Sequence, residues 1–228
     1  MFDADTFALL GKGIIESLYM TAVSSLFSYL FGLPLGILLV VSERRGLQPR
    51  AKWLQRLNAG LNAVIGFLVN IFRSIPFLIL LIMMIPVTRK IVGTTLGPTA
   101  VIVPLVIAAT PYIARMVESS IKEVDDGMIE AAKSMGASTW QIVCKVLIPE
   151  AKPSLINGAA ISVTTILSYS ALAGATGGGG LGDIAIRYGY YRYETGMMMA
   201  TVVLLVAIVQ LIQVAGTRLA KMTDKRIR

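Results

Sequence analysis

The chain has 228 residues, of which 55% are hydrophobic and only 15% are charged, with a mean hydropathy of +0.73. A soluble domain typically has about 25% charged residues, so this composition excludes an ordinary soluble enzyme. With no histidine and one cysteine, Cys144, the chain cannot build a histidine-ligated metal site or an intrachain disulfide, and we expect no metal. We assign the net charge of +8 to the loops of a membrane protein and expect no nucleic-acid partner.

Five long apolar windows follow one another along the chain. Each reaches the roughly 20 residues that a helix needs to cross a bilayer core of about 30 Å. Continuous runs of this length favour helices over the alternating strands of a β-barrel. We therefore predict an all-α integral membrane protein, a single transmembrane domain over residues 1–228, with five spans: Leu18–Val41, Leu61–Val87, Pro98–Val117, Leu155–Ala175 and Gly196–Gly216.

The first window differs from a removable signal peptide. Asp3 and Asp5 precede it, and Lys12 is the only basic residue before it. Its apolar run is also too long, and no small-residue cleavage pattern follows. We expect this window to remain as a span.

Basic residues alternate in number from one inter-span segment to the next. The segments after spans 1, 3 and 5, with Arg115 at the end of span 3 counted among them, hold fifteen Lys and Arg, and the segments on the opposite side hold five. Cytoplasmic segments carry the positive excess. The count predicts an N-terminus outside the cell and a C-terminus in the cytoplasm, with residues 118–152 as a long cytoplasmic segment.

Arg73 is a charged residue inside the second window. A cation buried in lipid is costly and indicates a function by default. Alternatively, the span begins near Asn70 and Arg73 extends its charge to the membrane interface. Both interpretations stay open at this point, and we include Arg73 among the candidates for the translocation route.

The fourth window is the most polar of the uncharged ones. Such residues either join helices through hydrogen bonds or line a water-filled route. Both interpretations stay open. The candidates for the route in this window are Asn157, Thr165, Ser168, Tyr169 and Ser170.

The segment 118–152 predicts a pair of short helices. Asp125 or Asp126 is a suitable N-cap for a first helix over residues 127–135. Gly136 follows, at the place where a left-handed helix stop favours glycine. The pair is either a simple linker or a docking surface for a cytoplasmic partner.

The second short helix begins with a capping-box pattern. Ser138 is followed three residues later by Gln141. We expect this helix to run to about Ile148 and to end at Pro149. Pro153 then suits the first turn of the fourth span.

The same segment resembles the EAA loop of ABC importer permeases, in which it forms the coupling helix that sits in a cleft of the ATPase subunit. The full spacing includes a glycine and a proline, which makes it far more specific than Glu-Ala-Ala alone. By this resemblance, the residues that couple the chain to the ATPase are Glu130, Ala131, Ala132, Gly136, Val146 and Pro149.

The resemblance extends along most of the chain and is strongest to the permeases of methionine importers. It implies methionine cargo, in L and D forms, and two copies of an ABC ATPase that bind ATP and magnesium. It also implies a second copy of this chain, an extracytoplasmic methionine-binding protein and a bacterial inner membrane. The segments that carry it are residues 73–77, 91–94, 111–118, 180–182 and 188–190.

The chain lacks the G-x-x-x-x-G-K-[ST] pattern of an ATP-binding loop, so we expect no cofactor on the chain itself. Gly177, Gly179 and Gly182 match a dinucleotide fingerprint but follow a membrane helix, and we predict a flexible outer turn there. The alternatives are an importer for another amino acid or a peptide, and an ATP-independent channel. A membrane enzyme would have few catalytic groups to use, so we expect a non-catalytic transport subunit.

Overall fold

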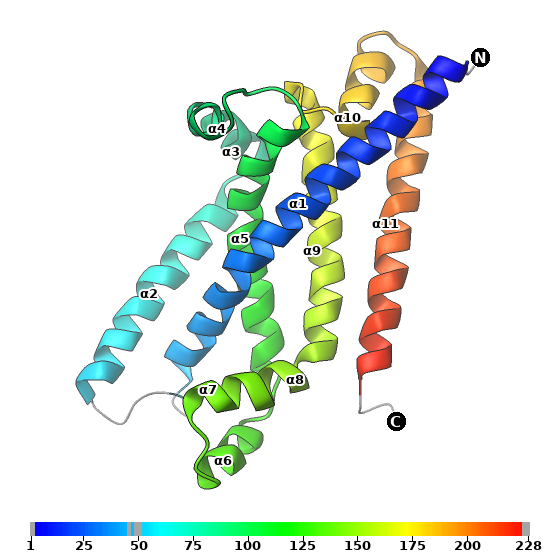
Figure 1. Cartoon of the computed structure of the whole chain (residues 1–228). Helices are drawn as coiled ribbons and strands as arrows, with labels where there is room; N and C mark the ends of the chain where they lie inside the picture. Colours follow the sequence, from blue (N-terminus) through cyan, green and yellow to red (C-terminus); the bar gives the residue numbers. More distant parts are fainter. Residues whose placement is uncertain (1–2, 45–46, 48–51, 225–228) are drawn as a thin grey trace. The chain divides into compact units, whose positions relative to one another are not determined.

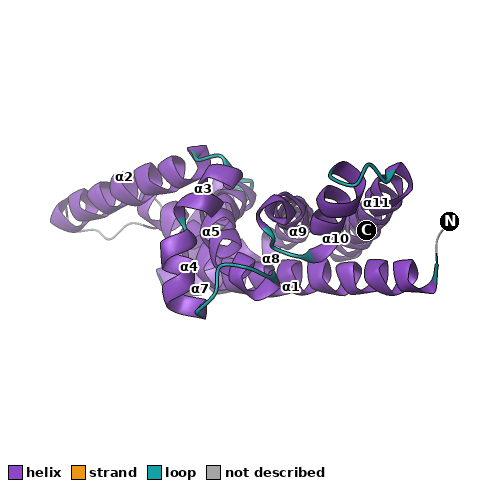
Figure 2. Ribbon diagram, turned by 90° about the horizontal axis from the view of Figure 1, so that it is seen from above, coloured by secondary structure: helices purple, strands orange, loops and turns teal. Residues whose placement is uncertain are grey.

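The computed structural model describes residues 3–44, 47 and 52–224. These residues form helices and connecting turns, and no strand occurs among them (Figure 2). The predicted all-α class is therefore confirmed for this part of the chain. The chain packs as two compact units. The single transmembrane domain that the sequence indicates stays a prediction.

Unit 1 consists of Met1–Ser28, Ile75–Ala109 and Ile161–Ala215, and unit 2 of Tyr29–Ser74, Thr110–Ala160 and Gly216–Arg228. Four long helices contribute residues to both units (Figure 1). All four are long and apolar enough to cross a membrane, which matches four of the five predicted windows. These helices are α1 (Ala4–Glu43), α5 (Pro98–Lys122), α9 (Lys152–Ala173) and α11 (Thr195–Thr223).

The second predicted window, residues 61–87, is not one uninterrupted helix. The structure has α2 (Lys52–Ser74), α3 (Phe77–Met83) and α4 (Ile85–Val92), with a sharp bend after α2. Proline lacks an N–H and disfavours helical geometry in the residue before it, so Pro76 ends α2 and leaves Ile75 outside both helices. The described chain therefore has four helices that are long and apolar enough to span a membrane, or five candidate spans if α2 and α3 together form one bent span.

In unit 1, the first part of α1 packs on α10 (Gly180–Ile184) and on the start of α11. Their apolar contacts centre on Leu10, Leu181, Ile184 and Met197, all buried. Two side chains of α1 also cap α10, because the Glu16 carboxylate accepts from the Gly180 N–H at 2.8 Å and Ser17 Oγ accepts from the Leu181 N–H at 2.9 Å. These bonds satisfy donors that a helix start leaves without partners.

The glycine-rich turn before α10 is tightly packed, where the sequence predicted a flexible one. A Cβ on Gly174 or Gly182 would lie under 3.0 Å from neighbouring backbone atoms. Gly177 and Gly179 have positive φ angles of 77° and 80°, which glycine adopts at little cost. The Gly97 N–H donates to the Gly177 carbonyl at 3.0 Å. These glycines allow close backbone approach and form no cofactor fingerprint.

In unit 2, α1 and α5 touch at their backbones. A Cβ on Gly36 would lie 2.6 Å from the Ala114 carbonyl oxygen, and one on Gly32 would lie 2.9 Å from that of Thr110. Small residues allow this approach. The result is a close helix pair whose α5 member leads directly into the segment after Lys122.

Candidate functional site

The segment from Asp125 to Ala151, which we call the hairpin, belongs to unit 2. It contains α6 (Asp126–Ser134), α7 (Thr139–Ile142), a π-helical turn (Val143–Leu147) and α8 (Ile148–Glu150). Figure 1 shows α6 and α7 as short helices joined by a turn. The two short helices that the sequence predicted are therefore present.

Both predicted N-caps of the hairpin and the predicted stop at Gly136 are confirmed. Asp125 is the N-cap of α6, and its Oδ1 accepts from the Gly127 N–H at 2.7 Å. Gly136 has a φ of 82°, the left-handed conformation expected after a helix. Ser138 and Gln141 form a reciprocal capping box at the start of α7. Local spacing alone fixes these features.

The prediction that Pro149 ends the second helix is wrong. Helical geometry continues through Val143–Leu147 as a π-helical turn and then to Glu150. The Ile148 N–H donates to the Val143 carbonyl, five residues earlier. This wider turn accommodates Pro149, which has no N–H to donate and would crowd a carbonyl four residues back in an α-helix.

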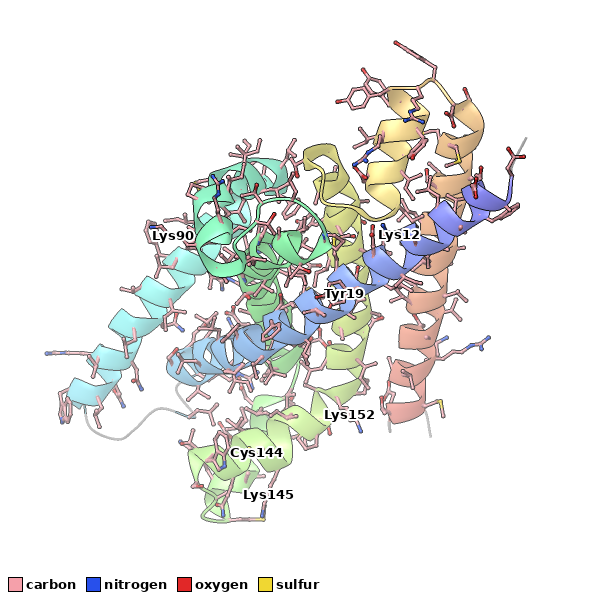
Figure 3. All side chains as sticks on the ribbon, turned by 45° about the horizontal axis from the view of Figure 1, so that its top comes forward. Lys12, Tyr19, Lys90, Cys144, Lys145 and Lys152 are labelled. Atoms are coloured by element: carbon pink, nitrogen blue, oxygen red, sulfur yellow. The ribbon has the colours of Figure 1, made fainter. Side chains whose placement is uncertain are left out.

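The hairpin has a buried face and an exposed one. Six apolar residues are buried within unit 2: Ile129, Ala132, Ile142, Val143, Leu147 and Ala151. Three large apolar side chains are instead exposed, Met128 by 39%, Met135 by 81% and Trp140 by 73%. Figure 3 shows Cys144 and Lys145 on the same hairpin, and both are exposed.

The residues that the sequence assigned to ATPase coupling divide between these faces. Glu130, Ala131, Gly136 and Pro149 are exposed, Val146 is half-buried and Ala132 is buried. The structure therefore brings four of the six onto the accessible surface of one hairpin. Ala132 packs beneath them.

Residues just after α1 contact the hairpin and the end of α5, and sequence reasoning missed these contacts. Arg44 Nη2 donates to the carbonyls of Lys122 at 2.9 Å and Val124 at 2.8 Å. Its Nη1 lies 3.5 Å from Asp126 Oδ1. In addition, Thr139 Oγ1 donates to the Leu47 carbonyl at 3.3 Å.

A chain of ion pairs continues from this attachment along α5. Glu118 is buried at 4% exposure and pairs with Arg115 at 2.6 Å and Lys122 at 2.8 Å. Lys122 also pairs with Glu43 of α1 at 2.6 Å. The spacing of three and four residues on one helix face was the sequence signal for the α5 pairs; the partner on α1 gave no such signal.

Two route candidates lie in unit 2. Arg73 is the residue before the last of α2 and is exposed, so it lies beside the break between α2 and α3. Asn157 is exposed on α9. It lines a polar hollow of about 400 Å³ together with Glu123 and Glu150.

The other route candidates lie on the part of α9 in unit 1. The hydroxyls of Thr165, Ser168 and Ser170 donate to carbonyls of α9 itself, at 2.9, 3.1 and 2.7 Å. The Tyr169 ring stacks on Phe77, with centroids 4.7 Å apart. These contacts do not gather the candidates into one binding site, and the route stays a prediction.

Long apolar helices with one exposed hairpin define a helical membrane protein that spans the bilayer several times. The chain matches the model of the family described as "Binding-protein-dependent transport system inner membrane component" over residues 32–228, and it belongs to that family. The resemblance that the EAA-like spacing indicated is thereby confirmed.

Relatives match between 73% and 92% of the chain, and a solved structure matches 98% of it. A probable D-methionine transport system permease protein MetI of Vibrio cholerae is 48% identical over 211 residues, 92% of this chain and 90% of that protein. The D-methionine transport system permease protein MetI of Escherichia coli K12 is 49% identical over 166 residues, 73% of each chain. A chain from inward-facing conformations of the MetNI methionine ABC transporter aligns with a TM-score of 0.91 and 48% identity, covering 98% of this chain and 100% of that one.

Proposed function

We propose that this chain is the transmembrane permease subunit of an ATP-driven importer that carries methionine, L or D, across a bacterial inner membrane. The observation that carries the proposal is the near-full-length similarity to permeases of methionine transport systems, with 48% identity and a TM-score of 0.91 to a chain of the methionine transporter. Such identity over 98% of the chain extends well beyond the hairpin.

The ATPase partner docks on the exposed face of the hairpin. Glu130, Gly136, Met135 and Trp140 are accessible there, while the buried face holds the hairpin in unit 2. The chain has no phosphate-binding loop of its own, so ATP and magnesium bind to the partner. This chain is then a non-catalytic subunit.

The assembly contains two copies of this chain and two ATPases. One chain carries one hairpin, and the ATPases of such importers work as pairs, so a twofold arrangement gives each ATPase one hairpin. An extracytoplasmic methionine-binding protein delivers the cargo. The positive excess on one set of loops supports a cytoplasmic hairpin and C-terminus, with the N-terminus outside.

The free energy that drives transport comes from the conformational states of the ATPase. A ligand shifts a conformational equilibrium only by its difference in affinity for the two conformations. ATP favours closure of the paired ATPases, the hairpins move with them, and the spans alternate between access from outside and from inside. Arg73, Asn157, Thr165, Ser168, Tyr169 and Ser170 remain the candidates for the route.

The test is ATP-driven uptake of labelled methionine into vesicles that hold this chain, its ATPase and its binding protein. Uptake that excess unlabelled methionine blocks, and other amino acids leave unchanged, is the expected result. ATP hydrolysis that depends on this chain, without methionine uptake, would keep the importer class and replace the cargo by another amino acid or a peptide. Passive flux without ATP would instead indicate a channel.

A further inference from the structure

We propose that Arg44 is a positioning residue that transmits the movement of the hairpin to α1 and α5. In this view the hairpin, the parts of α1 and α5 in unit 2, and α2 move as one body during transport. The inference rests on the proposed function, because it names the residues through which an ATPase at the hairpin acts on the spans.

The contacts of one guanidinium group carry the proposal. Arg44 follows the last residue of α1, and its side chain is only 15% exposed. It donates to two carbonyls at the end of α5, those of Lys122 and Val124, and faces the carboxylate of Asp126 at the start of α6. One side chain therefore joins α1, α5 and the hairpin.

Arginine suits this position for physical reasons. The last carbonyls of a helix lack donors from within the helix and carry partial negative charge, so a cation there is favourable. The guanidinium presents several N–H groups in a fixed planar fork. Here Nη2 donates to both carbonyls, while Nη1 lies 3.5 Å from the Asp126 carboxylate and pairs with it by charge. The ammonium of lysine is instead a compact point charge on a flexible stem.

The helices that Arg44 joins are themselves held closely together. Gly32 and Gly36 allow α1 to touch the backbone of α5. On α5, Arg115 donates to the Gly66 carbonyl at 3.2 Å and to Asn70 Oδ1 at 3.0 Å, which attaches α2. Packed backbones and charge-assisted bonds resist small deformations, so a displacement at Arg44 reaches all three helices.

A second contact ties α2 to α1. Asn62 Nδ2 donates to the Leu39 carbonyl and to Ser42 Oγ, both at 2.8 Å. The Glu43–Lys122 ion pair adds a further contact between the ends of α1 and α5.

The other end of the hairpin is attached differently. It passes into α9 through Ala151, whose N–H donates to the Leu147 carbonyl at 2.9 Å. Ser154 of α9 and Ser120 of α5 form a neutral hydrogen bond, Oγ to Oγ at 3.1 Å. Movement reaches α9 along the covalent chain, and it reaches α1 and α5 through Arg44.

The experiment compares variants in the reconstituted importer, with the number of ATP molecules hydrolysed per methionine taken up as the readout. We expect Arg44→Ala to raise this ratio about fivefold or more, the lower end of usual coupling factors, while ATPase binding and ATP hydrolysis persist. Asp126→Asn keeps both carbonyl bonds and should raise the ratio less. Arg44→Lys should fall between Arg44→Ala and the unaltered chain.

The matched control is Arg187→Gln, which removes one cation from an exposed pair with Asp183 in unit 1. Its ratio should equal that of the unaltered chain, and an equal rise there would overturn the proposal. An unchanged ratio in an assembled Arg44→Ala importer would also overturn it. If Arg44→Ala does not assemble, unchanged ratios in both Arg44→Lys and Asp126→Asn overturn it instead. Failure of the proposed function looks different, since the unaltered chain would then neither take up methionine nor affect its ATPase.

Discussion

Two glycine-containing turns, one in each unit, depend on glycine for different reasons. In unit 1, Gly174 and Gly182 press against neighbouring backbone, and a Cβ at either would collide with it. In unit 2, a Cβ on Gly136 would meet nothing within 4 Å, and only its φ of 82° requires glycine. Gly174 and Gly182 are thus needed for space, whereas Gly136 is needed for its backbone conformation.

The difference also separates stability from function. The unit 1 turn is locked to α1 by Glu16 and Ser17, so changes there should act on folding. The hairpin turn beside Met135 is open to solvent, so changes there should act on docking. The following substitutions test this separation, in order of decreasing expected effect.

The largest effect is expected for Gly182→Ala. The added methyl group would collide with the backbone at Ala171, which cannot move aside as a flexible side chain can. Overpacking of this kind costs about 1–3 kcal/mol and occasionally more, and we expect the upper end. Thermal unfolding of the purified chain in detergent measures the loss. Gly11→Ala, in the same unit with open space around its Cβ, is the control and should be neutral or slightly stabilising; equal losses in both would contradict the packing explanation.

Ser17→Ala should have the next largest effect. Ser17 is buried and accepts from the Leu181 N–H, so the substitution leaves a buried donor without its partner. The expected loss in unfolding free energy is about 1–3 kcal/mol. Glu16→Gln keeps an acceptor for the Gly180 N–H and should lose less. The same unfolding assay compares the two variants. A larger loss of unfolding free energy for Glu16→Gln than for Ser17→Ala would refute the capping role of Ser17.

Gly136→Val should cost about 1–2 kcal/mol locally, because a β-branched residue is strained at a positive φ. We expect the variant to insert into the membrane normally and to bind the ATPase more weakly. The measurement is the binding of the purified ATPase to the permease in detergent, compared between Gly136→Val and the unaltered chain. Asn tolerates the left-handed region, so Gly136→Asn should retain most of the binding, and normal binding by Gly136→Val would argue against docking at this turn.

The smallest effect is expected for Cys144→Ser. The thiol is exposed and unpaired by any disulfide, and it borders an apolar groove of about 590 Å³ beside Pro34 and Trp140. Surface substitutions usually change stability by less than about 0.5 kcal/mol. Uptake and unfolding of this variant should match those of the unaltered chain, and a clear loss would assign the thiol a role that its position does not explain.

Local sequence spacing predicted the features that depend on neighbouring residues. The caps at Asp125 and Ser138 and the stop at Gly136 each require groups within three residues, so spacing was sufficient. Hydrophobic run length predicted five spans, and four of those windows correspond to single helices long and apolar enough to cross a membrane. The break at Pro76 had a sequence signal in the proline itself, but the apolar residues on both sides favoured one uninterrupted span.

Long-range contacts gave no comparable signal. Arg44 and Val124 are 80 residues apart, and Glu16 and Gly180 are 164 apart. Nothing in a single sequence pairs such residues, since tertiary packing brings them together. The π-helical turn before Pro149 was also missed. Spacing rules assume that a proline ends a helix, whereas this wider turn accommodates the proline and lets the helix continue.

The most direct test of the hairpin as the ATPase docking surface is photocrosslinking from Met135. A Met135→Cys variant on a Cys144→Ser background carries one thiol, on a side chain that is 81% exposed, and a photoreactive maleimide labels it selectively. In vesicles that take up methionine, illumination should join the permease to the ATPase subunit, and Gly136→Val on the same background should weaken this product. Active vesicles that give no adduct with the ATPase would contradict the account.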